Sequence, residues 1–430
     1  MPGKKASNVA FIISHSAQQK LYRPIVEGDH GRSFTIFHKT IKEDIELKKS
    51  LESNGHKYRK YTDDNNLIHI LEIERVNILI TENIGNVLLK DIMPKLQVFY
   101  LQHSHDIVSY IPQKLSIETL SKVDKFLLFS DYWKECFIDS LEEKFKDNLN
   151  EVQHIREKTI AVGFPEIEQI KNFSKQDILK KFNIESSKEK IIFFDPIGTV
   201  NHVGNVFYGY FFKLHGSFLN KIKIFGKQFF YDIFHHPLKT PKILFLILKL
   251  CLDKKFTYNY QSLLLDLRDY CDKNNAMLVV KSREKNNDPD YIKILPDIYT
   301  HDLEFYPFTL LELLFVSDLY IGFNSTTTIE AVASATNAMQ INVCPKKYQY
   351  HDYGEGIYSY LDLQLSTKFS WNNYPGIVNV IDHNTPIKHL IVEKDFKIDE
   401  NLQKAYIKKF LIDLDNSSSR LMSNIFNENE

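Results

Sequence analysis

The chain has 430 residues, of which 43% are hydrophobic and 25% are charged, and its formal net charge is −1. One hydrophobic core rarely serves so long a chain, so we expect two domains. A charge this close to zero argues against a protein that is basic throughout for binding nucleic acid, and we expect no nucleic-acid partner. The cysteines lie far apart, which argues against a zinc finger or a disulfide framework; they are Cys136, Cys251, Cys271 and Cys344.

Apolar runs alternate with amphipathic stretches through the first part of the chain. The runs predict strands at 8–13, 77–81, 96–101, 125–129 and 159–162. Between the first two, an amphipathic stretch predicts a helix that ends at a glycine, Gly55. Strands that alternate with helices are typical of a parallel sheet. We therefore expect an N-terminal Rossmann-like domain over residues 1–165.

The alternation restarts after a linker that contains Pro165. Ser174, three residues before Asp177, predicts the N-cap of the first helix beyond this linker. Further apolar runs predict strands at 190–195, 276–280, 318–321, 338–343 and 377–381. We expect a second Rossmann-like domain over residues 166–400, facing the first across a cleft. The last segment, 401–430, is expected to be helical and to pack back toward the N-terminal domain.

The stretch "GFNSTTTIEA" follows a predicted strand with a glycine for a tight turn and then a run of small polar groups. Ser325, Thr326 and Thr327 fall at the start of the next helix, where free N–H groups and the helix dipole favour an anion. We expect a donor phosphate here and a ribose contact from Glu330. The alternatives are simple N-capping by the hydroxyls and an ordinary first-turn glutamate.

A second polar loop, "VVKSREKNNDPD", also follows a predicted strand. Lys281 and Arg283 could neutralise a diphosphate there, or they could be solvated loop charges. The same loop holds Asp288 and Asp290 in an Asp-x-Asp pattern that matches a metal site only superficially. We expect no metal ion and no other cofactor.

Histidines follow two predicted strands of the first domain. His103 and Asp106 lie just beyond 96–101, and His15 lies just beyond 8–13. The unperturbed pKa of histidine suits proton abstraction near neutral pH, so these residues are candidates for a catalytic base. The alternative is a polar surface histidine in a loop.

The order of these features resembles the CDP-glycerol glycerophosphotransferase-like group of GT-B transferases, which build teichoic acids and capsular or other surface polysaccharides. The stretches that carry the resemblance are "YLQHSHDI", "FLLFSDYWKECF" with "VGFPEIEQI", "VSDLYIGFNSTTTIEAV" and "YIKKFLIDLDNSSSRLMSNI". Where the group has His-Gly, this sequence has His103-Ser104, and where it has His-Pro, this sequence has Lys281-Ser282.

The resemblance implies an α/β GT-B fold and transfer of a glycosyl or glycerol-phosphate group from a nucleotide-activated donor. It also implies that the 1–165 domain lies on the acceptor side and that the 166–400 domain binds the nucleotide donor. That donor would be CDP-, CMP- or UDP-linked, and the acceptor would be a hydroxyl of a glycan, lipid-linked in this group. A non-hydrolysing UDP-sugar 2-epimerase and an inactive nucleotide-binding protein are the alternatives.

The segment 200–256 carries nine lysines and two aspartates, a formal charge of +7, and it is rich in aromatic residues. Such a segment suits the interface of an anionic membrane, and its alternative is a buried core helix whose lysines reach outward. No run of 18 apolar residues occurs, so no segment is expected to span a bilayer. We expect a cytoplasmic protein, either free or peripheral on the inner face of the membrane.

Overall fold

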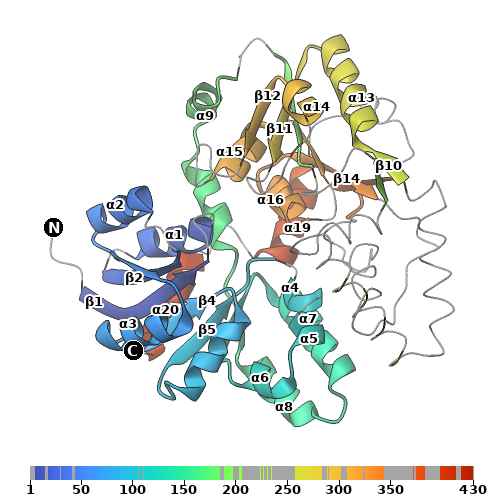
Figure 1. Ribbon diagram of the computed structural model, residues 1–430. Coiled ribbons are helices and arrows are strands. Elements are labelled where there is room, and N and C mark those ends of the chain that lie inside the picture. The colour runs from blue at the N-terminus through green and yellow to red at the C-terminus, as the bar shows by residue number, and fades with distance from the viewer. Residues whose placement is uncertain are drawn as a thin grey trace. The chain divides into compact units, whose positions relative to one another are not determined.

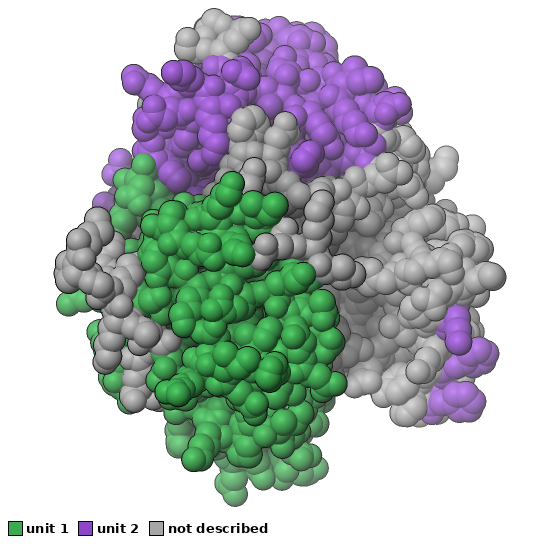
Figure 2. Space-filling model, turned by 60° about the vertical axis from the view of Figure 1, so that its left-hand side comes forward, with its two compact units in different colours: residues 1–172, 407–430 green, residues 173–406 purple. Residues whose placement is uncertain are grey.

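The protein consists of two compact units, residues 1–172 with 407–430 (unit 1) and residues 173–406 (unit 2), which Figure 2 colours separately. The computed structural model describes residues 5–14, 18–29, 31–40, 44–104, 106–109, 111–184, 188–196, 203–205, 223, 226, 230, 234, 257–282, 288, 290–301, 308–322, 325–342, 371, 374–382, 398–412 and 418–429.

The core of unit 1 is a parallel sheet with the order β3-β2-β1-β4-β5-β6-β7 (Figure 1). All described pairs in this sheet are parallel, as expected for strands joined by helices. The strands are β1 (Lys5–Ile13), β2 (Arg32–Lys39), β3 (Lys57–Tyr61), β4 (Ile78–Thr81), β5 (Gln97–Leu101), β6 (Lys125–Leu128) and β7 (Thr159–Ala161).

Helices connect these strands and continue to the end of the unit. They are α1 (Gln19–Gly28), α2 (Ile45–Ser53), α3 (Asp64–Ile73), η2 (Ile84–Asp91), α4 (Asp106–Ser109), α5 (Ile111–Lys114), α6 (Ile117–Ser121), α7 (Asp131–Lys144), α8 (Leu149–Glu157), η3 (Pro165–Asn172) and α20 (Ser418–Asn429). Gly55, the predicted end of the second helix, has φ of 77° just beyond α2, where glycine is favoured.

Unit 2 contains a second parallel sheet, ordered β12-β11-β8-β13-β14-β15. Its strands are β8 (Lys190–Phe194), β11 (Ala276–Ser282), β12 (Ile298–His301), β13 (Leu319–Gly322), β14 (Asn337–Asn342) and β15 (Val378–Asp382), and β9 (Val203–Asn205) with β10 (Thr257–Asn259) forms an antiparallel pair. The helices are α9 (Lys175–Lys181), α13 (Tyr260–Lys273), α14 (Asp290–Ile294), α15 (Thr309–Val316), α16 (Thr327–Ala333) and α19 (Glu400–Phe410), which continues into unit 1. Ser174 caps α9 as predicted, since its side chain accepts the N–H of Asp177.

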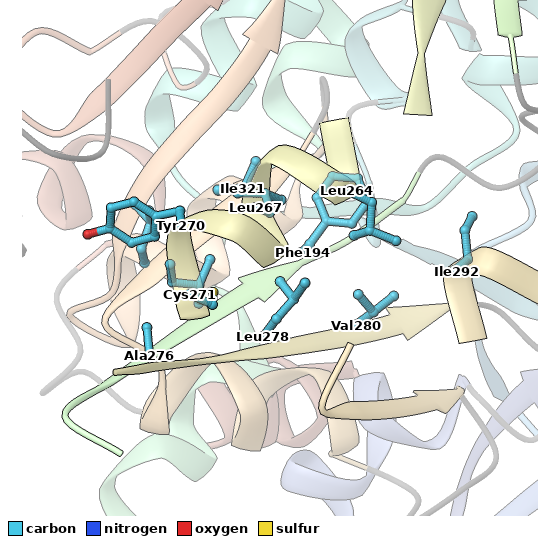
Figure 3. Packing of buried hydrophobic residues seen from close by; sticks show 12 residues of the cluster. Phe194, Leu264, Leu267, Tyr270, Cys271, Ala276, Leu278, Val280, Ile292 and Ile321 are labelled. Atoms are coloured by element: carbon cyan, nitrogen blue, oxygen red, sulfur yellow. The ribbon is translucent and has the colours of Figure 1, made fainter. Parts of the chain in front are cut away.

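One face of the unit 2 sheet packs against α13 (Figure 3). Alternate residues of β8, β11 and β13 join side chains of α13 in a buried cluster; its members are Ile192, Phe194, Leu264, Leu267, Tyr270, Cys271, Ala276, Leu278, Val280, Ile292, Leu319 and Ile321. Burial raises the pKa of the Cys271 thiol to about 12, so this cysteine is a core residue rather than a nucleophile. By the same alternation, Lys281 belongs to the opposite face of the sheet from Val280.

Gly322 closes β13, and its role differs from the tight turn that the sequence predicted. Its φ lies outside the left-handed region. A Cβ at this position would instead overlap the phenol ring of Tyr320. Tyr320 is fully buried, and its ring centroid lies 5.8 Å from that of Phe193, so the ring cannot easily move away from an added Cβ. Position 322 therefore requires a residue without a side chain.

We expect Gly322→Ala to destabilise unit 2 by roughly 1–3 kcal/mol, the usual cost of overpacking a core. A lower urea midpoint for the variant would show this. Gly31→Ala is the matched control, because a Cβ there would meet only Asp29 Oδ1, at 3.6 Å. An equal midpoint for the two variants would contradict the explanation.

The C-terminal helix α20 packs on α1 within unit 1, as the sequence predicted. Gly163 has φ of 89°, and a Cβ there would lie 2.6 Å from Ser418 Oγ at the start of α20. Glu168 accepts the hydroxyl of Ser419 at 2.8 Å and its backbone N–H at 3.3 Å, which caps the helix. Two of the stretches that carry the family resemblance, the linker and the closing segment, therefore meet each other in a structural contact.

Asp29 at the end of α1 accepts hydrogen bonds from two side chains and from the backbone N–H of Gly31. Arg32 Nη1 lies 2.6 Å from its Oδ2, and the Ser423 hydroxyl donates to the same oxygen at 2.7 Å. Burial raises the pKa of the carboxyl, but the hydrogen bonds from Ser423 and Arg32 outweigh this, so the pKa of Asp29 is lowered. The ionised carboxyl therefore stabilises the fold above its unfolded pKa, and this contribution is lost as pH falls through the lower folded pKa.

We accordingly expect Asp29→Asn to lower the urea midpoint at pH 6 and to lower it much less at pH 3. Asp139→Asn is the control, because Asp139 is exposed on α7. A deficit for Asp29→Asn that is the same at both pH values would show that the charge of Asp29 is not what stabilises the contact.

Candidate functional site

The two sheets share one strand order. Read outward from β1 and from β8, each has the order 3-2-1-4-5-6, and unit 1 adds a seventh strand. In such sheets ligands bind beyond the carboxyl ends of the strands, at the point where the order reverses. That point lies between β1 and β4 in unit 1 and between β8 and β13 in unit 2. Among the predicted site residues that the structure describes, His103 follows β5, Lys281 lies near the end of β11, and Ser325 and Thr326 follow β13, so these residues lie at the carboxyl edges of their own sheets.

His103 lies two residues beyond the end of β5, and its position is set by Gln102. The Gln102 side chain is fully buried and bridges two loops: its Oε1 accepts the N–H of Phe129 at 2.9 Å, and its Nε2 donates to the carbonyl of Ser104 at 3.1 Å. The His103 side chain is 33% exposed. An imidazole that is held by its backbone but still reachable from solvent suits a general base.

Glu82, which the sequence analysis did not select, lies against this histidine. It follows β4, the neighbour of β5, and its Oε2 is 3.6 Å from His103 Nδ1. The signal was present in the sequence, because Glu82 comes directly after a predicted strand, and consecutive strands of a parallel sheet are often neighbours.

Asp106 and His15 are the other predicted catalytic residues of unit 1. Asp106 begins the short helix α4, and the structure describes its backbone but not its side chain. His15 lies outside the described residues. Their catalytic roles stay predictions.

The hydroxyl groups of unit 2 lie at the start of α16, as predicted. The hydroxyl of Ser325 accepts the backbone N–H of Thr327 at 3.2 Å and donates to the hydroxyl of Thr327 at 3.1 Å. Ser325 therefore makes a local turn contact one residue before the N-cap, Thr326, whose own side chain makes no capping hydrogen bond. Ser325 and Thr326 are partly exposed, and Thr327 is buried. Hydroxyls have further donor and acceptor capacity, so this local contact does not prevent contact with a ligand.

Glu330 differs from an ordinary first-turn glutamate because it is only 3% exposed. Every residue of α16 is buried, so the helix runs through the interior of unit 2. A carboxylate in such a place is costly unless it is hydrogen-bonded or paired.

Lys281 is 5% exposed at the end of β11, so it is not a solvated loop charge. The next residue, Ser282, is fully buried and pairs with His301 at the end of β12. Nδ1 of His301 is buried and has no hydrogen-bond partner in the described part of the chain. A histidine therefore lies at this edge of the sheet, on the strand beside Lys281-Ser282. Arg283 lies outside the described residues.

A metal site is not evident among the described residues, where no group of three or more His, Cys, Asp or Glu side chains is placed to hold an ion. Asp288 is buried and accepts the Tyr299 hydroxyl at 3.0 Å.

No protein-family model and no curated protein matches the sequence. Solved structures do match over the whole chain. Two structures of the wall teichoic acid polymerase TagF, both histidine variants and one soaked with CDPG, have TM-scores of 0.58 and 0.57 at 11% and 10% identity; each covers 100% of this chain, with 89% and 91% of TagF covered.

UDP-GlcNAc 2-epimerase from Neisseria meningitidis, bound to UDP-GlcNAc, has a TM-score of 0.53 at 10% identity, covering 98% of this chain and 100% of the epimerase. Likeness at such low identity establishes the architecture. The chain has the predicted GT-B fold, with two Rossmann-like units and a C-terminal helix that returns to the first.

Proposed function

We propose that the protein is a transferase that moves a glycosyl or glycerol-phosphate group from a nucleotide-activated donor to a hydroxyl of a surface polysaccharide. The observation that carries the proposal is that polar side chains lie at the carboxyl edges of both sheets of this GT-B fold. The edge of the unit 2 sheet gathers a buried lysine and a run of hydroxyls, and the edge of the unit 1 sheet presents His103.

In the proposed reaction, His103 takes the proton of the acceptor hydroxyl, and His15 is the alternative base. The hydroxyls of Ser325 to Thr327 and the ammonium of Lys281 neutralise the charge that develops on the leaving nucleotide, joined by Arg283. Proton removal and charge neutralisation are both supplied by side chains. The chemistry therefore needs no metal ion.

Two nucleotide-linked ligands support a nucleotide donor. TagF was soaked with CDPG and the Neisseria enzyme was bound to UDP-GlcNAc, both on this fold. These two cases support a CDP- or a UDP-linked donor, and a CMP-linked donor stays a prediction of the family resemblance. Histidine was substituted in both TagF structures, which adds support for a histidine in the mechanism.

A UDP-sugar 2-epimerase is the second candidate, favoured by the likeness to the Neisseria enzyme over 98% of the chain. An epimerase acts on a free nucleotide sugar, whereas a transferase releases the nucleotide only when an acceptor is present. Acceptor dependence of turnover therefore separates the two.

The test uses purified protein with CDP, CMP and UDP and their glycerol or sugar conjugates. A ligand at 100 times its Kd stabilises the native state by about 2.7 kcal/mol, so a thermal shift with one nucleotide identifies the donor class. Release of that nucleotide from its conjugate is then measured with and without a glycan acceptor. Release only with acceptor supports the proposal, and conversion of the conjugate alone supports the epimerase. Binding without turnover indicates an inactive nucleotide-binding protein.

The acceptor and its location belong to this proposal as well. The segment 200–256, with a formal charge of +7, would contact anionic lipids and bring the active site to a lipid-linked glycan. Most of this segment lies outside the described residues. Of the helices that the structure describes, none has the length and apolar composition needed to cross a membrane.

A further inference from the structure

We infer that Glu82 is a positioning residue for His103, holding its ring in the tautomer that carries the proton on Nδ1, so that Nε2 is the nitrogen that accepts a proton. This inference rests on the proposed function only for the role of His103 as the general base. The contact between Glu82 and His103 lies within unit 1 and does not depend on that function.

The two residues follow neighbouring parallel strands. Thr81, at the end of β4, pairs with Tyr100 of β5, so Glu82 and His103 emerge at the same edge of the sheet. Glu82 Oε2 is 3.6 Å from His103 Nδ1, and the side chains are 17% and 33% exposed, respectively. This distance is slightly longer than a hydrogen bond and within the range of an ion pair. In enzymes without bound substrate, the hydrogen-bond distances of catalytic histidines are often longer than usual.

The turn that carries Glu82 is well anchored. The hydroxyl of Thr81 accepts the backbone N–H of Asn83 at 3.0 Å and the side-chain amide of Asn86 at 2.7 Å. The side chain of Asn83 accepts the N–H of Gly85 at 3.0 Å and so caps η2. Glu82 therefore projects from a backbone that is fixed on both sides, as His103 does from the backbone held by Gln102.

The chemistry follows from the position of the carboxylate. A carboxylate at Nδ1 favours the proton on that nitrogen, so Nε2 carries the lone pair that acts as the base. The same carboxylate stabilises the imidazolium that forms after proton transfer. A partly exposed ion pair contributes little to stability. Replacing Glu82 is therefore expected to change the titration of His103 and not the stability of the fold.

The experiment compares Glu82→Gln and Glu82→Asp with the wild type, and with Glu72→Gln as the control, because Glu72 is exposed on α3. Nitrogen chemical shifts of His103 are followed by NMR across a pH titration without any substrate. For Glu82→Gln we expect a lower titration midpoint for His103 and a loss of the Nδ1–H preference, with the urea midpoint unchanged. Glu82→Asp should restore part of both signals, and Glu72→Gln should change neither.

Acceptor-dependent turnover gives the second readout. We expect kcat of Glu82→Gln to fall by at least about 10²-fold, and by less than the roughly 10⁴-fold loss that follows when a buried triad loses its carboxylate, with donor KM unchanged. A His103 titration and tautomer that are the same in Glu82→Gln and the wild type overturn the inference. A wild type without acceptor-dependent turnover overturns the proposed function and not the contact, because the titration uses no substrate.

Discussion

Replacing His103 with alanine is expected to lower acceptor-dependent nucleotide release by roughly 10²- to 10⁴-fold, the usual contribution of a general base. His103 is partly exposed and lies beyond the end of β5, so the change leaves the buried core of unit 1 intact. The donor contacts of the proposal come from unit 2, so donor affinity should stay the same. The measurements are kcat of nucleotide release and the Kd of the donor by calorimetry.

His154→Ala is the matched control, because the side chain of His154 is 59% exposed on α8. It should retain wild-type turnover. Unchanged turnover for His103→Ala would remove His103 from the mechanism and make His15 the remaining candidate base. A large loss of donor affinity would mean that His103 binds the donor instead.

The sequence predicted best those strands that are continuous apolar runs. β5 and β8 are examples, because strands of a parallel sheet are covered on both faces and so read as uninterrupted hydrophobic segments. The order of the strands then placed the candidate residues at the carboxyl edges. The fold and the location of the candidate site both followed from this pattern.

Two strands of unit 1 escaped prediction because they contain polar residues. In β2, Arg32, Thr35 and His38 are buried, and in β3 the sequence "KYRKY" reads as a charged surface segment. Their polar groups have partners elsewhere in the fold: His38 Nδ1 lies 3.1 Å from the Tyr58 hydroxyl on β3, and Arg32 pairs with Asp29 at the end of α1. A contact such as that between His38 and Tyr58, which are far apart in the sequence, cannot be predicted before the arrangement of the strands and helices is known.

The role of a residue was harder to predict than its place. Gly322 was expected to serve a turn, and the structure shows that it makes room for Tyr320, a packing relation that no local pattern reveals. Ser130 likewise carries part of the family resemblance. It is buried and donates to the carbonyl of Lys409 at 2.8 Å, so its contact is structural. Glu82 was missed because the spatial neighbour of His103 depends on strand order.

Replacing Ser325 and Thr326 together with alanine is expected to weaken donor binding by roughly ten- to hundredfold. A hydrogen bond to a charged group contributes about 1.5–3 kcal/mol, which corresponds to that change in Kd. The expected result tests whether the hydroxyls at the start of α16 contact the donor phosphate or have only a local structural role. Calorimetry with the donor nucleotide measures it directly.

The turn contact requires its own control, because the Ser325 hydroxyl accepts the N–H of Thr327. Its loss should cost about 0.5–1.5 kcal/mol of stability, the usual contribution of one hydrogen bond, whether or not a phosphate binds there. Ser174→Ala removes a comparable serine-to-backbone hydrogen bond at the start of α9 in the same unit, since the Ser174 hydroxyl accepts the N–H of Asp177 at 3.4 Å. Equal losses of stability in the two variants, with weaker donor binding only in the double variant at 325 and 326, would identify a phosphate site. Unchanged donor affinity in that double variant would leave these hydroxyls with a local structural role only, and Lys281 would be the remaining proposed phosphate contact among the described residues.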